Sequence, residues 1–230
     1  AAVSAFVSDQ LDVPNPYPFC DPMLSFIKVQ NIASRPALDG NDVDGFLTKI
    51  TKELKVLEAF SFTHTATKGG EQTNNVVFDS RSPRMAVLKD IIEKAIIEYR
   101  EEFAARSDQP FIRNWPGNAT REGWFVRVRQ GGYQEMHTHN TAWLSGVLYL
   151  KVVENPKGSE GAIRFSLNSG KYPTLAKECD AVVHQPNVGD LVLFPSSLFH
   201  GTNPVVQDVE RCCIAFDVLP ATVNSKKEQH

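Results

Sequence analysis

The sequence has no long apolar run and no cluster of basic residues. No stretch approaches the roughly 20 consecutive apolar residues that a membrane-spanning helix needs. Lysine and arginine number 24 against 27 aspartates and glutamates, a net charge of -3. Nucleic-acid-binding domains usually carry a basic patch or stripe. The sequence therefore predicts that the protein binds neither a membrane nor a nucleic acid.

Cysteine is scarce, with four residues in 230, and no pair has the spacing of a zinc site. Cys212 and Cys213 are adjacent, so on a strand they point to opposite faces and do not bridge each other. The first residues, Ala1–Ala5, lack the basic and apolar segments of a secretory signal peptide. Together these features predict free thiols and a cytoplasmic protein.

The first half of the chain has helical periodicity. Apolar residues recur at helical spacing over 42–57 and, more regularly, over 82–105, where Pro83 follows a serine that can cap the helix. Residues 1–40 contain closely spaced prolines and are expected to be extended, and residues 63–75 are polar and are expected to form a loop. We therefore expect a helical layer within residues 1–109.

The second half changes to short apolar segments separated by glycine, proline and asparagine. We predict eight strands: 124–130, 134–139, 145–152, 162–167, 181–184, 190–194, 200–205 and 211–219. Eight short strands with such turns indicate a two-sheet jelly roll. The predicted fold is mainly β with a helical buttress, around a cupin-like double-stranded β-helix core over residues 110–222. A tail, 223–230, completes a single compact domain.

Three histidines form the candidate metal site. His137 and His139 are two residues apart, so on a strand both imidazoles would face the same way. His200 follows about sixty residues later, after a glycine-initiated apolar segment, and distant strands of a jelly roll can lie side by side. Imidazole suits iron, zinc, copper and nickel. We therefore predict that His137, His139 and His200 bind one metal ion, whereas His64 and His184 are expected to be surface residues.

Arg211 is the candidate anchor for an anion. It opens an apolar strand in which Arg211, Cys213 and Ala215 share one face. A guanidinium on the inner face of a sandwich is costly unless it is paired, and it can hold a carboxylate through two parallel hydrogen bonds. We expect either a bound dicarboxylate or a nearby acidic side chain to pair with it.

At this point the sequence resembles the iron(II)- and 2-oxoglutarate-dependent dioxygenases. In that superfamily a double-stranded β-helix binds iron through His-x-Asp/Glu and a distal histidine, and an arginine about ten residues later binds 2-oxoglutarate. The closest likeness is to a group with a His-x-His motif, followed by Leu-Ser-Gly-Val-x-Tyr-Leu and then Phe-Pro-Ser-x-x-x-His. In this chain these motifs are His137–His139, Leu144–Leu150 and Phe194–His200, and the resemblance covers residues 110–220.

The chain departs from the superfamily pattern at two positions. His139 stands where the carboxylate ligand is expected, and Cys213 replaces a residue that often bears a hydroxyl. Either three imidazoles bind the iron, or two bind it and water takes the third place. In the superfamily, loss of the carboxylate can also accompany halogenation.

The resemblance implies an Fe(II)- and 2-oxoglutarate-dependent hydroxylase that releases succinate and CO2. Arg211, Tyr149 and Cys213 would contact 2-oxoglutarate. From strand alternation we expect Arg127 to face the barrel interior and contact an anionic substrate, and Trp143, beside the metal loop, to line the substrate pocket. The other partners would be O2 and a small-molecule or amino-acid/peptide substrate. The sequence does not decide whether the protein forms a homodimer. It also does not decide between hydroxylation and other outcomes such as desaturation or cyclisation.

Two alternative functions remain. A cupin-type iron dioxygenase without 2-oxoglutarate is suggested by the spacing of Gly131 from His137 and of Gly189 from Pro195, but it would not require Arg211. A non-enzymatic jelly-roll binding module would contain no tightly bound iron. Oxygen uptake that depends on 2-oxoglutarate would distinguish the predicted oxygenase from the cupin-type enzyme. Metal analysis of the purified protein would distinguish it from the binding module.

Overall fold

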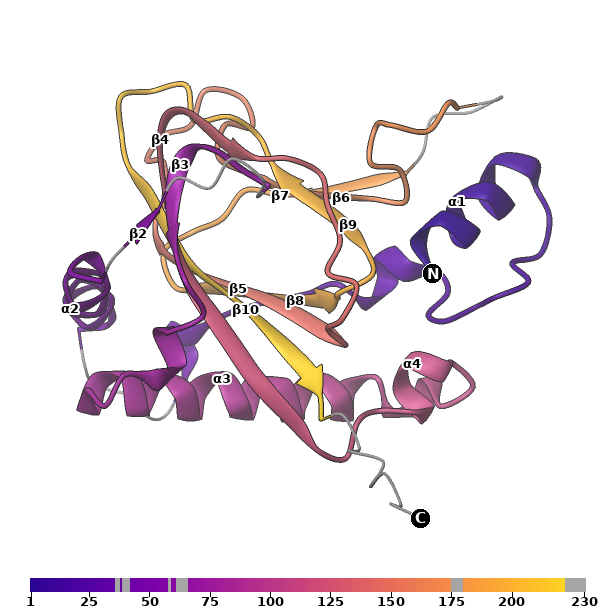
Figure 1. The fold of residues 1–230 in the computed structure, drawn as a ribbon, viewed down its shortest axis with the longest axis horizontal. Coiled ribbons are helices and arrows are strands. Elements are labelled where there is room, and N and C mark those ends of the chain that lie inside the picture. Colours follow the sequence, from indigo (N-terminus) through magenta and orange to yellow (C-terminus); the bar gives the residue numbers. More distant parts are fainter. Residues whose placement is uncertain (36–37, 39–41, 58, 61–65, 175–179, 222–230) are drawn as a thin grey trace, which may run out of the picture.

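The computed structural model describes residues 1–35, 38, 42–57, 59–60, 66–174 and 180–221. Seven strands form one antiparallel sheet in the order β1-β8-β5-β10-β4-β3-β2, and three form a second sheet in the order β7-β6-β9. Figure 1 shows the two sheets facing each other, with helices below the larger one. The strands are β1 (Lys28–Asn31), β2 (Ala59–Phe60), β3 (Thr67–Thr73), β4 (Ala119–Gln134), β5 (Leu144–Lys151), β6 (Ile163–Ser166), β7 (Ala181–His184), β8 (Asp190–Pro195), β9 (Phe199–Thr202) and β10 (Arg211–Pro220).

The segment after β4 links the two sheets. β4 pairs with β10 and β3 in the larger sheet, whereas Gln134 at its end donates its backbone N–H to the Thr202 hydroxyl of β9. Further along, His137 and His200 form an isolated antiparallel bridge. One continuous chain therefore serves both sheets, which is the geometry of a double-stranded β-helix, and the predicted jelly-roll core is confirmed.

Helix α3 (Pro83–Glu102) lies along the outer face of the larger sheet (Figure 1). The Tyr99 hydroxyl donates to the Phe26 carbonyl at 2.6 Å, which ties the helix to the segment before β1. An amphipathic helix gains most of its stability from burying such a stripe against a core, and this helix does so with all the apolar residues that the sequence picked out: Met85, Leu88, Ile91, Ile92, Ala95, Ile96 and Tyr99.

The remaining helical elements complete the layer around the sheets. Helix α2 (Val43–Lys55) begins at Asp42, whose carboxylate accepts from the Gly45 backbone N–H at 2.9 Å. Such an N-cap satisfies an otherwise unpaired backbone donor. The other helices are α1 (Ala2–Leu11), α4 (Pro110–Arg113) and the short 3₁₀ turns η1 (Met23–Phe26), η2 (Ile32–Ser34), η4 (Val77–Asp79) and η5 (Ala104–Arg106).

Three sequence-based expectations were wrong. Residues 2–11 form helix α1 rather than an extended segment, and residues 67–73 form strand β3 rather than a loop. The separate strands expected at 124–130 and 134–139 are replaced by one long strand, β4, and a bridging segment. Polar β3 was missed because its residues pair along the edge of β4 without adding a continuous apolar face. The predicted tail, 223–230, lies outside the described residues.

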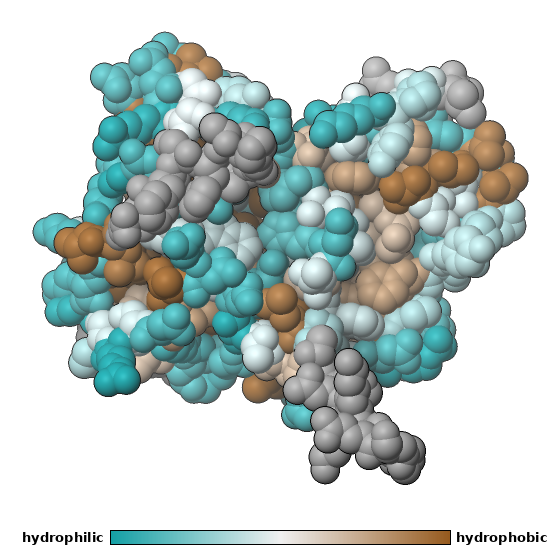
Figure 2. All heavy atoms as spheres, in the orientation of Figure 1, coloured by the Kyte–Doolittle hydropathy of each residue, from teal (hydrophilic) through white to brown (hydrophobic). Residues whose placement is uncertain are grey.

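Helix α1 presents an apolar surface to solvent. Val3, Val7 and Leu11 are 45%, 45% and 53% exposed, whereas Phe6 on the opposite side is buried and contacts Tyr172. Figure 2 shows apolar, brown surface at the right-hand edge of the molecule, where Figure 1 places α1. None of the helices in the described part of the chain is long and apolar enough to cross a bilayer.

A buried carboxylate joins two loops of the structure. Glu160 accepts hydrogen bonds from the backbone N–H groups of Lys157, Val206 and Gln207 and from the Gln207 side chain, at 2.6–3.0 Å. These donors, Lys157 first, hold the pKa of Glu160 at about 2, below its ordinary 4.5. Because the folded-state pKa is lowered, the carboxylate stabilises the fold above pH 4.5 and loses that effect as the pH falls towards 2.

We expect Glu160→Gln to lower the thermal unfolding midpoint at pH 7. The neutral amide oxygen accepts hydrogen bonds more weakly than a carboxylate, and the amide NH2 group would face the N–H donors that the carboxylate now binds. The difference in unfolding midpoint between the variant and wild type should shrink as the pH falls from about 4.5 towards 2. Over this range Glu160 is protonated in the unfolded wild-type chain but not in the folded one, which favours unfolding. Glu154→Gln, on the exposed part of the same turn, is the control and should match wild type. An unchanged midpoint for Glu160→Gln would contradict this role.

Candidate active site

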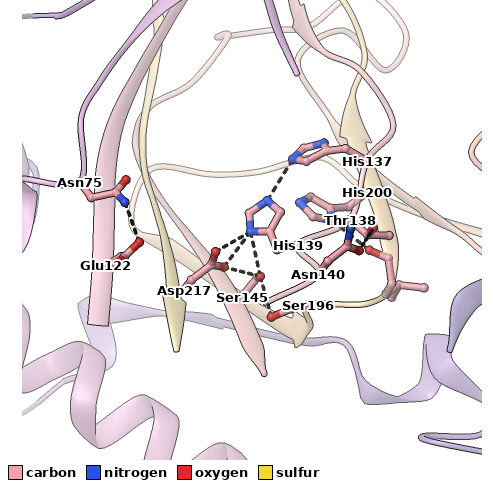
Figure 3. A network of polar contacts seen from close by, with 11 residues as sticks. Asn75, Glu122, His137, Thr138, His139, Asn140, Ser145, Ser196, His200 and Asp217 are labelled. Carbon is pink, nitrogen blue, oxygen red and sulfur yellow. Dashed lines mark hydrogen bonds and ion pairs between the residues drawn. The ribbon is translucent and has the colours of Figure 1, made fainter. Parts of the chain in front are cut away.

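Backbone pairing brings the three predicted histidines together. His137 and His200 exchange two backbone hydrogen bonds of 2.9 and 3.0 Å between their N–H and carbonyl groups. The His139 backbone N–H donates to the Ser196 carbonyl at 2.9 Å, just before β9. The His-x-His segment is therefore held beside β9, although it is not a regular strand, and all three rings gather at one end of the barrel (Figure 3).

The ring nitrogens are arranged to bind a metal ion. One potential ligand atom from each of His137, His139 and His200 lies within 4.8 Å of the others. Each Nδ1–H has an acceptor: the Glu135 carbonyl for His137 at 2.7 Å, the Leu198 carbonyl for His200 at 3.0 Å, and the Asp217 carboxylate for His139 at 2.7 Å. These bonds fix the proton on Nδ1 and leave the Nε2 lone pair available to a metal.

The environment keeps two of these rings neutral. Burial, followed by the nearby His139, lowers the pKa of His137 to about 4. Burial lowers the pKa of His200 well below its ordinary value, with His137 adding to the effect. Only the neutral imidazole can act as a ligand, so both rings are in the binding form at neutral pH.

The donor set fits a divalent iron ion. The Nε2 atoms of His137 and His139 are 3.1 Å apart, close enough for both to bind one ion. Three neutral nitrogen ligands suit a borderline metal such as Fe(II). These contacts, rather than the motif alone, indicate that the site is built for a metal.

A second group of polar residues, which the sequence reasoning missed, supports His139. The Asp217 carboxylate accepts from His139 Nδ1 at 2.7 and 2.8 Å and from the Ser145 hydroxyl at 2.6 Å. Since a hydroxyl has one proton to donate, Ser145 accepts from Ser196, whose oxygen is 2.9 Å away. Strand alternation could have identified Asp217, because it continues the face of Arg211, Cys213 and Ala215.

A cavity of about 170 Å³ opens beside the three histidines. Its polar lining comes from Gln72, Gln134 and Thr202, and Trp124 lies 5.6 Å from the His139 ring, centroid to centroid. The rest of the lining is mostly apolar: Ala66, Gly146, Val147, Ile163, Phe194, Gly201 and Ala215, with Ser145 at its inner end. Among the described residues that line the cavity, only the histidines carry an ionisable side chain.

Arg211 is buried further along the same interior face. It is 1% exposed, and its Nη2 donates to the Tyr149 hydroxyl at 3.3 Å. Within the described part of the chain, its Nε and Nη1 atoms have no hydrogen-bond acceptor. A buried, unpaired guanidinium is strongly unfavourable. Arg211 is not among the residues lining the cavity, but it shares the β10 face with Ala215, which is.

Tyr149 and Cys213 lie between the cavity and Arg211. They are opposite each other on β5 and β10, and both are fully buried. Burial raises the pKa of the Tyr149 hydroxyl to about 12 and also raises the pKa of the Cys213 thiol. Both groups are therefore protonated at neutral pH, and the tyrosine that accepts from Arg211 can still donate its own proton. The structure thus groups the three predicted 2-oxoglutarate contacts.

The predicted substrate contacts Arg127 and Trp143 are not brought to the cavity. Arg127 lies opposite Cys212 on the outer face of the sheet, where it forms an ion pair with Glu71. Trp143 packs on Phe111 of α4, with ring centroids 5.9 Å apart, and its Nε1–H donates to the Phe111 carbonyl. The expectation that Arg127 faces the barrel interior was wrong, because the register of β4 places Trp124 and Val126 there instead.

The remaining histidines and cysteines considered in the sequence analysis are placed as follows. His184 Nε2 lies 3.0 Å from an Asp190 carboxylate oxygen, away from the three metal-site histidines. Cys20, Cys212 and Cys213 are free and buried. His64 and Cys179 lie outside the described residues.

Residues 122–217 match the family described as "Putative 2OG-Fe(II) oxygenase". The match begins near the start of β4, ends at Asp217, and includes all three histidines and Arg211. No curated protein sequence matches the chain.

Several solved structures share this fold. A prolyl-4-hydroxylase from Pseudomonas putida has a TM-score of 0.57 at 18% identity, covering 96% of this chain and 100% of its own. A prolyl hydroxylase from Trichoplax adhaerens, in complex with a hypoxia inducible factor peptide fragment, has a TM-score of 0.55 at 16% identity, covering 95% and 89%. HygX from Streptomyces hygroscopicus, with nickel, 2-oxoglutarate and hygromycin B bound, has a TM-score of 0.54 at 16% identity, covering 88% of each chain.

Proposed function

We propose that this 2OG-Fe(II) oxygenase hydroxylates a C–H bond of a small-molecule or amino-acid/peptide substrate. In the overall reaction, substrate, O2 and 2-oxoglutarate give hydroxylated substrate, succinate and CO2. One oxygen atom enters the new hydroxyl group and the other enters succinate, and decarboxylation of the keto acid supplies two electrons. His137, His139 and His200 would hold the iron, which when bound would activate O2 for C–H oxidation.

The observation that carries this proposal is the unpaired guanidinium of Arg211. Its Nε and Nη1 donors point to no acceptor among the described residues, although the side chain is 1% exposed. A carboxylate can accept two parallel hydrogen bonds from a guanidinium. The far carboxylate of 2-oxoglutarate would supply both the acceptors and the missing negative charge. A cupin-type dioxygenase that does not use 2-oxoglutarate would leave this group without a purpose.

The chain's own residues would position the cosubstrate. On one interior face, the order from the metal site is Asp217, Ala215, Cys213 and Arg211. The small Ala215 leaves room beside the cavity, and the protonated Tyr149 can donate a second hydrogen bond to the anion that Arg211 holds. A diacid lying along this face would have one end near the histidines and the other at the guanidinium.

The cavity lining favours a substrate group that is neutral and polar next to the metal. Gln72, Gln134 and Thr202 offer amide and hydroxyl groups, and Trp124 offers a flat apolar surface. A formal charge on the substrate would find no fixed opposite charge among these residues. Amide or hydroxyl groups, as in a peptide or a sugar-like molecule, match them better. The relatives bound to a peptide fragment and to hygromycin B are consistent with this range.

The direct test is anaerobic titration of the metal-free protein with Fe(II) and then 2-oxoglutarate. We expect a weak visible charge-transfer band from the chelated keto acid, saturating at one equivalent of each. On admission of air, O2 uptake should require 2-oxoglutarate and produce succinate in equal amount. A protein that binds iron and shows neither the band nor 2-oxoglutarate-dependent uptake would contradict the proposal and favour the cupin-type alternative. Failure to bind iron at all would favour the binding module.

A further inference from the structure

We propose that Asp217 is a positioning residue for the third metal ligand, His139, and supplies the negative charge that a directly bound carboxylate would otherwise contribute. This inference rests on the proposed function only in requiring that His139 binds the metal. Asp217 contacts no metal-facing nitrogen, so it would act through the imidazole and not as a ligand itself. Figure 3 shows its carboxylate behind the His139 ring.

The geometry of the contact is that of an oriented ligand. Both carboxylate oxygens of Asp217 lie within hydrogen-bond distance of His139 Nδ1, at 2.7 and 2.8 Å. Ser145 donates to one of them at 2.6 Å and is itself joined to Ser196. Ser145 and Ser196 are almost fully buried, so they restrict the carboxylate to one orientation. The ring is thereby held with Nε2 towards His137, 3.1 Å away.

The charges around Asp217 also suit a nearby cation. Asp217 is 8% exposed and pairs across the strands with Glu122, a second acid. In the part of the chain that the structure describes, neither residue forms an ion pair with lysine or arginine; Glu122 instead accepts from Asn75. Acids opposite each other on neighbouring strands are destabilising. A divalent metal held by His139 would offset this repulsion through the imidazole.

The formal charges of the site support the same conclusion. Three neutral imidazoles leave a divalent ion with both positive charges, whereas two imidazoles and a carboxylate ligand leave one. With Asp217 hydrogen-bonded to His139, the site again has one net positive charge, but the carboxylate is separated from the metal by the imidazole. Carboxylates that accept from a ligating histidine make the ring a stronger donor, and their loss typically costs about 10–100-fold in metal affinity.

The test is the affinity of the metal-free protein for Co(II), measured anaerobically for wild type and Asp217→Asn. Asparagine keeps the shape and an acceptor oxygen but removes the charge. We expect the dissociation constant to rise about 10–100-fold. Glu135→Gln is the matched control, because Glu135 contacts His137 only through its backbone carbonyl while its side chain pairs with Lys68. That variant should bind Co(II) like wild type.

A double-mutant cycle distinguishes positioning from direct ligation. If Asp217 acts through His139, adding Asp217→Asn to His139→Ala should cause no further loss of Co(II) affinity, and the visible Co(II) spectrum of Asp217→Asn should shift towards that of His139→Ala. If the two losses add, the residues act independently and the proposal is overturned. Equal affinity of Asp217→Asn and wild type would overturn it as well.

Folding is controlled separately. The thermal midpoint of each metal-free variant is measured first, and Ser145→Ala, which removes one hydrogen bond to Asp217 but keeps its charge, serves if Asp217→Asn does not fold. We expect Ser145→Ala to weaken Co(II) binding by a smaller factor than Asp217→Asn, and wild-type affinity in Ser145→Ala would overturn the proposed network. Because Co(II) binding needs no 2-oxoglutarate, the outcome does not depend on whether the keto acid is the cosubstrate.

Discussion

Replacing Arg211 by methionine is expected to weaken 2-oxoglutarate binding strongly while leaving the fold intact. Truncating one partner of a buried, hydrogen-bonded charge pair costs about 2–5 kcal/mol, which is about thirty- to several-thousand-fold in affinity. The stability of the metal-free protein should be unchanged or higher, because an unpaired buried guanidinium is removed and an apolar side chain of similar length replaces it. The measurements are isothermal titration with 2-oxoglutarate and thermal unfolding with and without it.

Arg127→Met is the matched control for this prediction. It removes a guanidinium from the neighbouring strand but from the outer face, where the partner is Glu71. This variant should bind 2-oxoglutarate like wild type and lose at most the small contribution of an exposed ion pair to stability. Metal affinity should be normal in both variants. Wild-type 2-oxoglutarate affinity in Arg211→Met would show that the buried guanidinium does not hold the cosubstrate.

Replacing His200 by alanine is expected to abolish specific metal binding and, with it, all 2-oxoglutarate-dependent oxygen uptake. His200 is 5% exposed and lies on β9, bridged to His137 of the His-x-His segment. Loss of a residue that only hydrogen-bonds to a ligand can weaken metal binding by about 100-fold. Loss of the ligand itself should weaken metal binding by more than this. Metal content after reconstitution and the charge-transfer band in the presence of 2-oxoglutarate measure the effect.

His184→Ala is the corresponding control, because it removes an imidazole that contacts Asp190 rather than the other histidines. Its metal content should equal that of wild type. Loss of metal in His184→Ala, or retention in His200→Ala, would contradict the assignment of the site. Thermal unfolding of both metal-free variants separates loss of a ligand from loss of the fold.

Local patterns in the sequence were sufficient wherever one physical rule dominates. The stripe of α3 followed from helical periodicity, because burying it is what stabilises such a helix. The side of β10 that bears Arg211 followed from strand alternation. In contrast, α1 and β3 were missed, since α1 is half exposed and β3 is a polar strand that depends on its partner, β4. Pairing with a distant strand leaves no local signal.

The same distinction between local pattern and distant pairing applies to the candidate site. The sequence by itself determined which residues were candidates for the chemistry: His137, His139 and His200 as nitrogen donors and Arg211 as a fixed cation on a buried face. These properties belong to the residue types and to the alternation of a strand. Only the tertiary structure decided that Asp217 contacts His139, that Trp124 and not Trp143 lies by the cavity, and that Arg127 faces outward. These depend on strand register, and a shift of one residue would reverse every face.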